Sequence, residues 1–555
     1  MTDKSTRTDV CIVGAGPAGL QAAYLLKRKG LSVVVLERGE AVGSFFRQFP
    51  RHRQLISINK VNTGLSHADA RFRYDWNSLI NDEGLEFGSY SRKYFPPADD
   101  YVRYLEDFAA PLADDIRCNT EVRRIDRRDG QFCVSCTDGS RIVADHVIAA
   151  TGVSKPWIAD IEGFELVEPY FDADLAPEGF ENKRVLVMGK GNSAFETADA
   201  LVEHAAAIHV ISPNPVRLAW NSHFVGHLRA VNNNFLDTYQ LKSQNAVIDA
   251  TITKIEKTGD VYTVTADMAA AEGHQITLQY DRIIACTGFR FDTSIFAPEL
   301  QPKLCENGKF PAMTAQWESD SAPGLWFAGT IMQFRDYRKT MSGFVHGFRH
   351  NVACLAEFIA ARQTGGGYPF ARADLDAEAL TETVINRLSL SSGLFLQPGF
   401  LADVIALDGP EMGRHYQDIP VAWATQDGPA ARGTCLMVTL EFGDFGANPM
   451  HVKRQHTAFG GEPDPFIHPV IRLMKNRKPV AEVHLSDHLD ADWRPIENRD
   501  AGAATVTQMT YHDLGRSMSP ADVAQAQLGG FLQSVMDQIA GEMPEIEADA
   551  PLVNS

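Results

Sequence analysis

The sequence predicts an α/β protein with two Rossmann-like dinucleotide-binding domains, followed by a C-terminal α+β domain. Three observations support this prediction. A glycine-rich turn follows an apolar run at residues 14–19, a second such turn lies at residues 189–194, and no similar turn follows the glycine run at residues 365–367. A chain of 555 residues is also long enough for several domains.

The first unit begins with the apolar run 10–13, which predicts a β-strand. The glycine-rich turn follows directly, a helix is expected over residues 20–29, and the β-branched run 32–36 predicts a second strand. Strand, turn, helix and strand in this order are typical of a dinucleotide-binding unit, whereas a glycine-rich turn without a ligand is the alternative.

Four residues of this unit have distinct roles in such a site. Gly14 permits the tight turn, Gly16 lets the backbone approach a pyrophosphate, and Gly19 lets the helix pack on the strand. The start of the helix offers amide groups and a favourable dipole to the phosphates. Glu37 ends the second strand, where an acidic side chain accepts a ribose hydroxyl.

The second unit repeats this order of strand, turn, helix and strand, but different residues follow its last strand. We expect a strand over residues 184–188, the turn Gly189-Lys190-Gly191-Asn192-Ser193-Ala194, a helix over 195–204 and a strand over 208–211. No acidic residue follows that strand. Ser212 and Arg217 come there instead and could accommodate a 2′-phosphate, which favours NADPH over NADH. Arg217 could equally be a solvated surface charge.

Each unit continues into a predicted β-meander, over residues 121–146 and 246–280. Each then ends in a strand and a glycine turn, at Thr151-Gly152 and Thr287-Gly288. This repetition indicates a domain duplication. A last apolar strand ends at Gly329 and Thr330, and a long helix is expected over residues 340–362.

Composition excludes several classes of function. The formal net charge of −19 argues against binding to nucleic acid or to an anionic membrane. No run of eighteen apolar residues predicts a membrane span, and the polar residues 1–9 do not suggest a secretory signal. Eight cysteines in this length do not form a disulfide framework, so we expect a cytoplasmic protein.

Two nucleotide sites in one chain imply hydride transfer from a nicotinamide to a tightly held acceptor, for which FAD is the natural candidate. With both turns and the Thr151, Thr287 and Gly329 strand ends, the chain resembles the two-dinucleotide-binding-domain flavoproteins. The resemblance implies an FAD-binding domain whose first part is 1–176 and whose second part is 291–365. The NAD(P)H-binding domain would be inserted at 177–290, and residues 366–555 would form a C-terminal α+β domain of unknown role.

Cysteine positions separate two branches of that family. Disulfide reductases carry a redox cysteine pair near the first acid or in the second nucleotide domain, but residues 38–60 and 177–285 contain no cysteine. Cys133 and Cys136 form a CxxC, yet on a predicted strand these positions face opposite sides. We therefore read them as two unrelated strand residues, with a redox pair as the alternative.

Other motifs resemble the class B flavin monooxygenases. They are the loop Gly43-Ser44-Phe45-Phe46, the stretch Ser57-Ile58-Asn59-Lys60, and Phe95-Pro96 before a helix expected over 101–108. The resemblance makes Asn59 the best catalytic candidate, because its amide could donate a hydrogen bond to a flavin-bound oxygen. A turn-capping role is the alternative for Asn59.

The implied cofactor contacts fall into two sets. Those expected for FAD are Gly14, Gly16, Pro17, Ala18, Gly19, Glu37, Arg38, Ser44, Phe45, Phe46, Asn59, Val122, Thr151, Gly152, Gly329 and Thr330. Those expected for NADPH are Gly189, Gly191, Asn192, Ser193, Ser212, Arg217, Thr287 and Gly288. No metal is expected, and the helical pair His346 and His350 reads as a helix face rather than a metal site.

The expected function is that of an FAD-dependent, NADPH-consuming monooxygenase. A flavin C4a-(hydro)peroxide would oxygenate a small nucleophilic substrate, with N- or S-oxygenation favoured. The alternatives are an NADPH-dependent flavin reductase or oxidase acting on a thiol, a quinone or O2, and a flavin-bearing binding protein. Residues 217–243 form a long insertion that reads as a lid or as a surface loop. A homodimer is possible, and no nucleic acid or membrane partner is expected.

Overall fold

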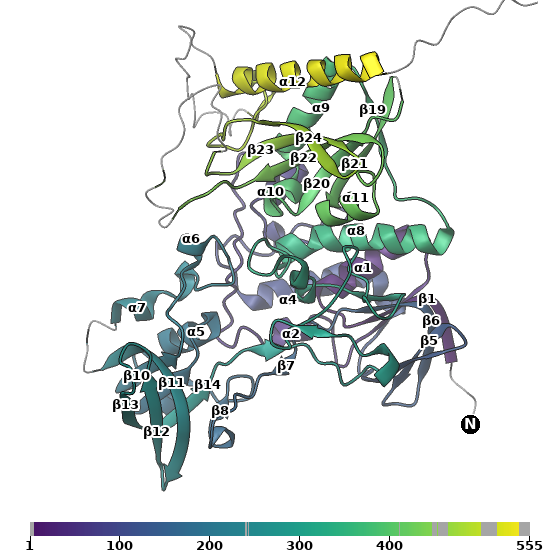
Figure 1. Ribbon diagram of the computed structural model, residues 1–555. Coiled ribbons are helices and arrows are strands. Elements are labelled where there is room, and N and C mark those ends of the chain that lie inside the picture. The colour runs from purple at the N-terminus through teal and green to yellow at the C-terminus, as the bar shows by residue number, and fades with distance from the viewer. Residues whose placement is uncertain are drawn as a thin grey trace, which may run out of the picture. The chain divides into compact units, whose positions relative to one another are not determined.

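The computed structural model describes residues 5–238, 241, 244–409, 411–446, 452, 464–500 and 519–542. The chain divides into two compact units (Figure 1). Unit 1 comprises residues 1–62 and 74–367, and unit 2 comprises residues 63–73 and 368–555. The segment 1–176, expected to fold as one part, is therefore interrupted, because residues 63–73 fold with the C-terminal unit. No pattern in their sequence indicated this.

The first sheet of unit 1 is mostly parallel around β1. Its strands, in sheet order, are β3 (Ile116–Arg117), β2 (Val33–Leu36), β1 (Ser5–Val13), β6 (Arg141–Ala149), β5 (Gln131–Cys136) and β4 (Val122–Arg128), and β18 (Leu325–Phe327) also pairs with β6. β2 and β6 both run parallel to β1, whereas β4 and β5 form an antiparallel meander. β2 is buried throughout, as expected for a strand covered on both faces.

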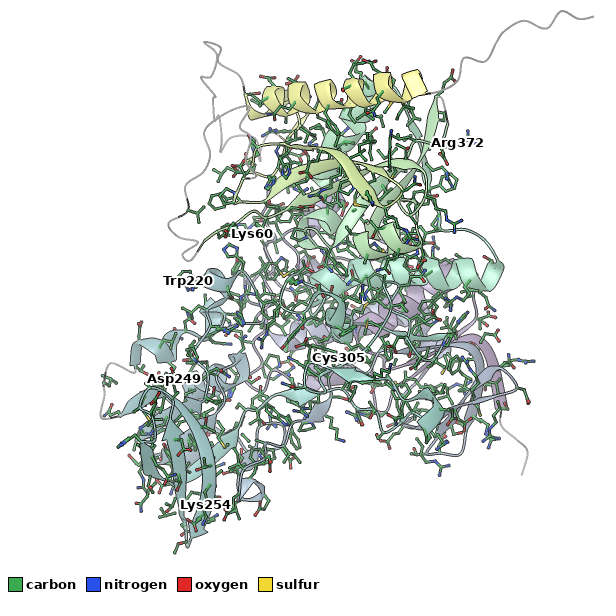
Figure 2. The ribbon with its side chains drawn as sticks, viewed as in Figure 1. Lys60, Trp220, Asp249, Lys254, Cys305 and Arg372 are labelled. Carbon is green, nitrogen blue, oxygen red and sulfur yellow. The ribbon has the colours of Figure 1, made fainter. Side chains whose placement is uncertain are left out.

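The second sheet of unit 1 repeats this arrangement. In sheet order its strands are β13 (Gln275–Tyr280), β12 (Val261–Met268), β11 (Asn245–Thr258), β10 (Ala207–Ser212), β9 (Arg184–Met188), β14 (Arg282–Ala285) and β8 (Glu168–Pro169). β10 and β14 run parallel to β9, and the long β11 carries both Asp249 and Lys254 (Figure 2). The duplication predicted from the sequence is therefore confirmed.

The helices of unit 1 are α1 (Pro17–Arg28), α2 (Ser44–Gln48), α4 (Ala98–Ala109), α5 (Asn192–Leu201), α6 (Ala219–Ser222), α7 (Asn234–Thr238) and α8 (Val345–Thr364). Among them, α1 contacts strands of the first sheet and α5 contacts strands of the second. α1 and α8 pack against each other. Short pairs β7 (Lys155–Pro156) with β15 (Phe289–Arg290), and β16 (Leu304–Cys305) with β17 (Phe310–Pro311), complete the unit.

Two local predictions needed correction. The expected loop at residues 43–46 contains the start of α2, because Gly43 adopts a left-handed conformation (φ 68°) that turns the chain into one short helix. The helix expected from residue 340 begins only at Val345, after the 3₁₀ helix η8 (Thr330–Asp336). Gly347 sits so close to the carbonyl of Met341 that a side chain would not fit at this first turn.

Unit 2 is an antiparallel sheet covered by helices. Its sheet order is β19 (Ala371–Asp374), β21 (Met412–Pro420), β20 (Leu401–Ala406), β22 (Thr434–Glu441), β23 (His468–Lys475) and β24 (Lys478–His484). Its helices are α3 (Ala68–Phe72), α9 (Ala377–Leu390), α10 (Ser392–Leu396), α11 (Val421–Gln426) and α12 (Pro520–Glu542). Leu388 of α9, Leu436 of β22 and Leu528 of α12 share one hydrophobic core.

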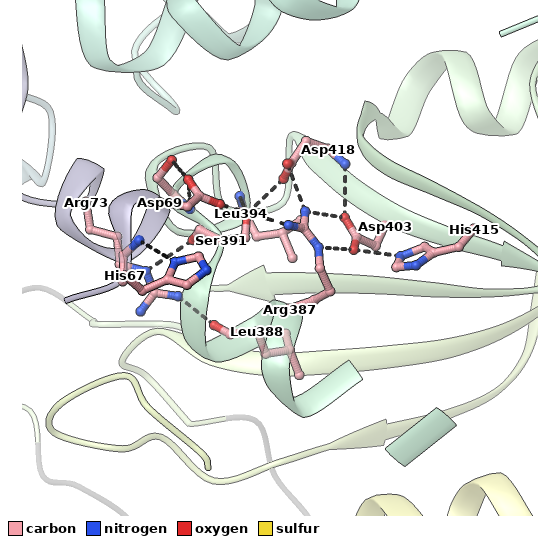
Figure 3. Close-up of polar contacts among 12 residues, drawn as sticks. His67, Asp69, Arg73, Arg387, Leu388, Ser391, Leu394, Asp403, His415 and Asp418 are labelled. Carbon is pink, nitrogen blue, oxygen red and sulfur yellow. Dashed lines mark hydrogen bonds and ion pairs between the residues drawn. The ribbon is translucent and has the colours of Figure 1, made fainter. Parts of the chain in front are cut away.

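A buried ionic network fixes the centre of unit 2 (Figure 3). Arg387 donates to Asp403 at 2.6 Å and to Asp418 at 2.8 Å, and His415 lies 2.8 Å from the same Asp403 carboxylate. The nearby Arg387 and His415 hold the pKa of Asp403 below its usual value against the opposing effect of burial. The α3 segment is tied to the same region, since Asp69 accepts a hydrogen bond from the Ser392 amide.

Candidate functional site

The first glycine-rich turn has the geometry of a pyrophosphate site. Gly16 caps the start of α1, and a side chain there would meet no atom within 4 Å, so the space above its backbone is open. Gly14 has a φ of 107°, and a Cβ there would lie 2.6 Å from the carbonyl oxygen of Ala150. Packing therefore requires glycine at position 14, whereas the open space at Gly16 leaves room for a ligand.

Glu37 is held in place by three donors. Its carboxylate accepts hydrogen bonds from the Ala15 amide (2.9 Å), the Gly39 amide (2.8 Å) and the Ser44 hydroxyl (2.9 Å). A carboxylate offers about four lone-pair sites, so one site remains for a ribose hydroxyl. This donor set and the open space above Gly16 fit an adenine dinucleotide such as FAD.

The other residues expected to contact FAD differ in their surroundings. Arg38 and Phe45 are exposed, Phe46 stacks edge-on against Tyr101, and Val122 is buried in β4. The Thr151 hydroxyl has no hydrogen-bond partner among the described residues. Gly329, with a φ of 87°, lies two residues after β18 and beside Ala18 of α1, and Thr330 donates to the carbonyl of Gly343 at 3.1 Å.

The second turn matches the first in detail. Gly191 caps α5 in an extended conformation with open space at its Cβ position, as Gly16 does for α1. Gly189 has a φ of 122°, and a side chain there would collide with the carbonyl of Cys286, the residue that follows β14. Thr287 donates to the carbonyl of Trp157 at 2.7 Å beside Gly288. The geometry fits a second dinucleotide.

An ion pair that the sequence did not reveal lies beside Ser212. Lys190 is almost fully buried and donates to the carbonyls of Ser212 and Asn214, each at 3.1 Å. It also pairs with the carboxylate of Asp249, which lies next to Ser212 in the β10–β11 register. The strand end therefore has a cation within the turn and an acid on the neighbouring strand, whereas Arg217 is exposed.

Asn192 anchors the insertion to the second turn. Its amide nitrogen donates to the carbonyl of His227 at 2.9 Å, and its amide oxygen accepts from the Arg229 backbone at 3.0 Å and from the Asn232 side chain at 3.1 Å. The side chain that was expected to contact the nucleotide is thus engaged by the insertion. Trp220 of α6 is 53% exposed (Figure 2), and residues 239, 240, 242 and 243 of the insertion lie outside the described residues.

Asn59 is 2% exposed and its orientation is fixed. Its side-chain amide donates to the carbonyl of Ser91 at 2.6 Å and makes a longer contact of 3.4 Å with that of Lys93. Its backbone pairs with Asp75 in an isolated antiparallel bridge. The short bond fixes one N–H, and the long, weak contact leaves the second N–H available to a stronger acceptor.

Next to Asn59 the structure brings together aromatic and cationic groups from distant segments. The Trp76 ring stacks on His346 with 4.1 Å between centroids, and the Arg229 guanidinium lies 5.2 Å from the Trp76 centroid. Phe344 packs beside His346, with 5.9 Å between their ring centroids. Sequence reasoning gave no role to Trp76.

His346 is a neutral member of this cluster. It is 1% exposed, and neither ring nitrogen has a hydrogen-bond partner among the described residues. Burial first, and then the positive charges of Arg349 and Arg229, lower the pKa of His346 well below its usual value. The described residues contain no group of three His, Cys, Asp or Glu side chains that could hold a metal ion.

All eight cysteines are free thiols. Cys133 and Cys136 are both buried on β5, where Cys133 pairs with Asp126 and Cys136 pairs with Val122 of β4. Burial raises the pKa of the Cys136 thiol. A raised pKa lowers the thiolate fraction that redox chemistry requires. Within the described part of the chain, no helix has the length and apolar character needed to cross a membrane.

Comparison with known proteins identifies relatives across most of the chain. Residues 11–329 match the pyridine nucleotide-disulphide oxidoreductase family. The chain is also 34% identical over 529 residues to the mouse (Mus musculus) FAD-dependent oxidoreductase domain-containing protein 2, a match that covers 88% of this chain and 78% of the mouse protein. The match extends beyond the nucleotide-binding residues, so unit 2 is shared at least in part.

Solved structures share the fold of about two thirds of the chain. Bacillithiol disulfide reductase from Bacillus cereus has a TM-score of 0.50 at 19% identity and covers 64% of this chain and 100% of its own. A flavin-containing monooxygenase from Stenotrophomonas maltophilia has a TM-score of 0.50 at 18% identity and covers 64% of this chain and 99% of its own. The predicted fold and the resemblance to two-dinucleotide-binding-domain flavoproteins are confirmed.

Proposed function

Because the chain belongs to the pyridine nucleotide-disulphide oxidoreductase family, we propose that it is an FAD-dependent monooxygenase that consumes NADPH. The family consists of flavin-dependent oxidoreductases that bind FAD and use NADPH, so the chain is a flavin-dependent oxidoreductase. The step from oxidoreductase to monooxygenase is our proposal. The observation that supports it best is the pair of matching nucleotide turns without a reactive cysteine pair beside either turn.

The surroundings of the two turns support one cofactor at each turn. Gly16 and the remaining lone pair of Glu37 would hold the FAD pyrophosphate and ribose. Gly191 and the start of α5 would hold NADPH, and Ser212 with the exposed Arg217 would accommodate a 2′-phosphate, since the three N–H groups of Lys190 are engaged by Ser212, Asn214 and Asp249. The proposed domain limits remain 1–176 and 291–365 for FAD, 177–290 for NADPH and 366–555 for the C-terminal domain, apart from the interruption at 63–73.

The proposed reaction balances with O2 as oxidant and NADPH as reductant. NADPH, O2, one proton and a nucleophilic amine or thioether would give NADP+, water and the N- or S-oxide. Bound FAD would accept the hydride and activate O2 for transfer of one oxygen atom. Asn59 would use its weakly engaged N–H to steady the reacting oxygen, and its short bond to Ser91 would keep the amide in position.

Coupling of NADPH consumption to oxygenation tests this proposal. The holoenzyme is supplied with NADPH and an amine, a thioether or a ketone, and NADP+, H2O2 and oxygenated product are measured together. We expect one class of substrate to give product in place of peroxide. Rapid mixing of the reduced holoenzyme with O2 should also give a transient flavin absorbance distinct from both end states. NADPH consumption that yields only peroxide with every class, without such a transient, would reject the monooxygenase.

The second candidate is a reductase that passes electrons to a disulfide, because a disulfide reductase shares this fold. The buried positions of Cys133 and Cys136 argue against it. Replacing both cysteines by serine should leave NADPH turnover unchanged under our proposal and abolish it under the reductase alternative. A third candidate, a flavin-bearing binding protein, would oxidise no NADPH under any condition.

We also propose a cytoplasmic location, since free buried thiols are usual in a reducing compartment.

A further inference from the structure

Arg229 is an unpaired cation in a strongly acidic chain. The sequence carries 71 acidic and 52 basic residues, yet the Arg229 guanidinium has no hydrogen bond or carboxylate partner among the described residues. Burial lowers the pKa of Arg229, which means that its charge is partly removed from water. A partly desolvated cation without an anionic partner is costly, so such a residue points to a missing anion.

The guanidinium is held over a fixed aromatic surface. Trp76, which lies beneath it, is anchored by its own amide, which donates to the carbonyl of Ile58 at 3.2 Å. Arg349 of α8 holds the same segment by donating to the carbonyls of Asp75 (2.8 Å) and Ser78 (2.9 Å). His346 supports the Trp76 ring by stacking against it. The Trp76 ring is therefore held in place by the protein itself, without a ligand.

The backbone of Arg229 is equally constrained. Its amide donates to the side chain of Asn192, the first residue of α5 after the second nucleotide turn. Trp76 directly follows Asp75, whose backbone pairs with Asn59. Arg229 is therefore held through its backbone by the second nucleotide turn, while its guanidinium lies over Trp76, the residue that follows Asp75. A substrate that reacts near Asn59 would lie beside this guanidinium.

We propose that Arg229 and Trp76 bind an anionic substrate, specifically a small planar molecule that carries a carboxylate. The carboxylate takes the fork of the guanidinium in a bidentate pair, and the planar group lies against the Trp76 ring. This inference rests on the proposed function, because it names the substrate class of that site. Its main competitor is that Arg229 binds a phosphate of NADPH.

Affinity measurements on the FAD-loaded full chain separate these readings. The probes are 4-(methylthio)benzoate, its neutral isostere 4-(methylthio)benzamide, and NADP+, each titrated with flavin absorbance or calorimetry as the readout. We expect the wild type to prefer the benzoate over the benzamide by about tenfold to a hundredfold, the value of a charge-assisted hydrogen-bond pair. Equal affinity for the two probes would overturn the proposal.

Two variants locate the preference. Arg229→Met should remove it while leaving the affinity for NADP+ unchanged, and Arg229→Lys should keep only part of it because lysine lacks the planar fork. Arg290→Met is the matched control, since Arg290 also lies over a tryptophan, Trp157, at 4.6 Å, but that ring is 43% exposed. Loss of NADP+ affinity in Arg229→Met with the benzoate preference intact would assign the residue to NADPH instead.

The anion-site proposal and the monooxygenase proposal can fail separately. If the wild type binds the benzoate selectively but NADPH consumption gives only peroxide with every substrate class, the monooxygenase proposal fails and the anion site stands. If coupled oxygenation occurs with both the benzoate and the benzamide at equal KM, the anion site fails and the monooxygenase stands. In a wild type that does both, Arg229→Met should raise KM for the benzoate with little change in the rate of flavin reduction by NADPH.

Discussion

The backbones of Asn59 and Asp75 pair across an isolated antiparallel bridge, although residues 63–73 between them fold as part of the other compact unit. The chain therefore leaves unit 1 after Asn62 and returns at Tyr74, so that the two segments paired by this bridge are joined through unit 2. The C-terminal domain is consequently not a simple appendage. It is completed by a segment that begins only four positions after Asn59.

Arg73 is expected to be essential for unit 2. Its buried guanidinium donates to the carbonyls of Leu388 (2.7 Å), Ala491 (2.9 Å) and Ser391 (3.1 Å). Arg73→Met would leave buried acceptors without donors and should cost about 3 kcal/mol or more in the free energy of unfolding. Chemical denaturation of the full chain measures the loss. Arg372→Met on the exposed β19 (Figure 2) is the control, and equal stability of the two variants would contradict the prediction.

Gly16→Ala should separate cofactor binding from folding. The backbone of Gly16 is extended and its Cβ position is open, so alanine fits without strain, but its methyl group would occupy the space assigned to the pyrophosphate. We expect the apo protein to melt as the wild type does and FAD affinity to fall by at least about tenfold. Gly14→Ala should instead lower the melting temperature of the apo protein, because Gly14 has a φ of 107°.

Asn59→Leu tests the proposed role of the amide. Loss of its N–H should reduce coupled product formation by about 100-fold and increase peroxide release, while flavin reduction by NADPH continues at the wild-type rate. Asn62→Leu changes an exposed asparagine of the same segment and should behave as the wild type. Coupling that stays intact in Asn59→Leu, with correctly folded protein, would mean that Asn59 only fixes the turn through Ser91.

Glu196 should make unit 1 less stable as the pH rises. Burial raises the pKa of Glu196 from 4.5 to about 7, so the folded protein binds one more proton than the unfolded chain between these values. This stability is fully present below pH 4.5 and is lost as the pH rises through 7. Glu196→Gln should therefore stabilise the protein at pH 8, by up to about 3 kcal/mol, and should have little effect at pH 5.

Thermal unfolding of Glu196→Gln at both pH values checks this sign. Glu203→Gln, at an exposed position just beyond α5, should leave the melting temperature unchanged at both pH values. A variant that is destabilised equally at both pH values would show that the hydrogen bond from Tyr170 to Glu196 matters more than the cost of burying the charge.

Asp403→Asn should destabilise unit 2 strongly. Asp403 is 1% exposed and accepts hydrogen bonds from both Arg387 and His415, so its loss leaves a buried guanidinium with Asp418 at 2.8 Å and the more distant Asp69 at 4.0 Å. Breaking such a pair costs about 3–5 kcal/mol, whereas an exposed pair contributes less than about 1 kcal/mol. Asp408→Asn removes the exposed partner of Arg414 and is the matched control in chemical denaturation. Equal losses would contradict the buried-pair argument.

The sequence by itself determined the two nucleotide-binding units. Their glycines, apolar runs and Glu37 are local signals, because a strand, a tight turn and a helix start each depend on neighbouring residues. In the C-terminal domain, the strand-like runs of the sequence at 468–473 and 480–485 and its helical run at 520–539 correspond for the same reason to β23, β24 and α12. Only their boundaries shifted by a few residues.

Only the tertiary structure decided which distant residues meet. Trp76, Arg229 and His346 come from a loop, an insertion and a helix start, and no periodicity links them. The Lys190–Asp249 pair likewise depends on the β10–β11 register, and the place of residues 63–73 in unit 2 depends on hydrogen bonds to residues more than 300 positions away. Contacts between segments follow from the packing of the whole chain, and a single sequence contains no local pattern that records them.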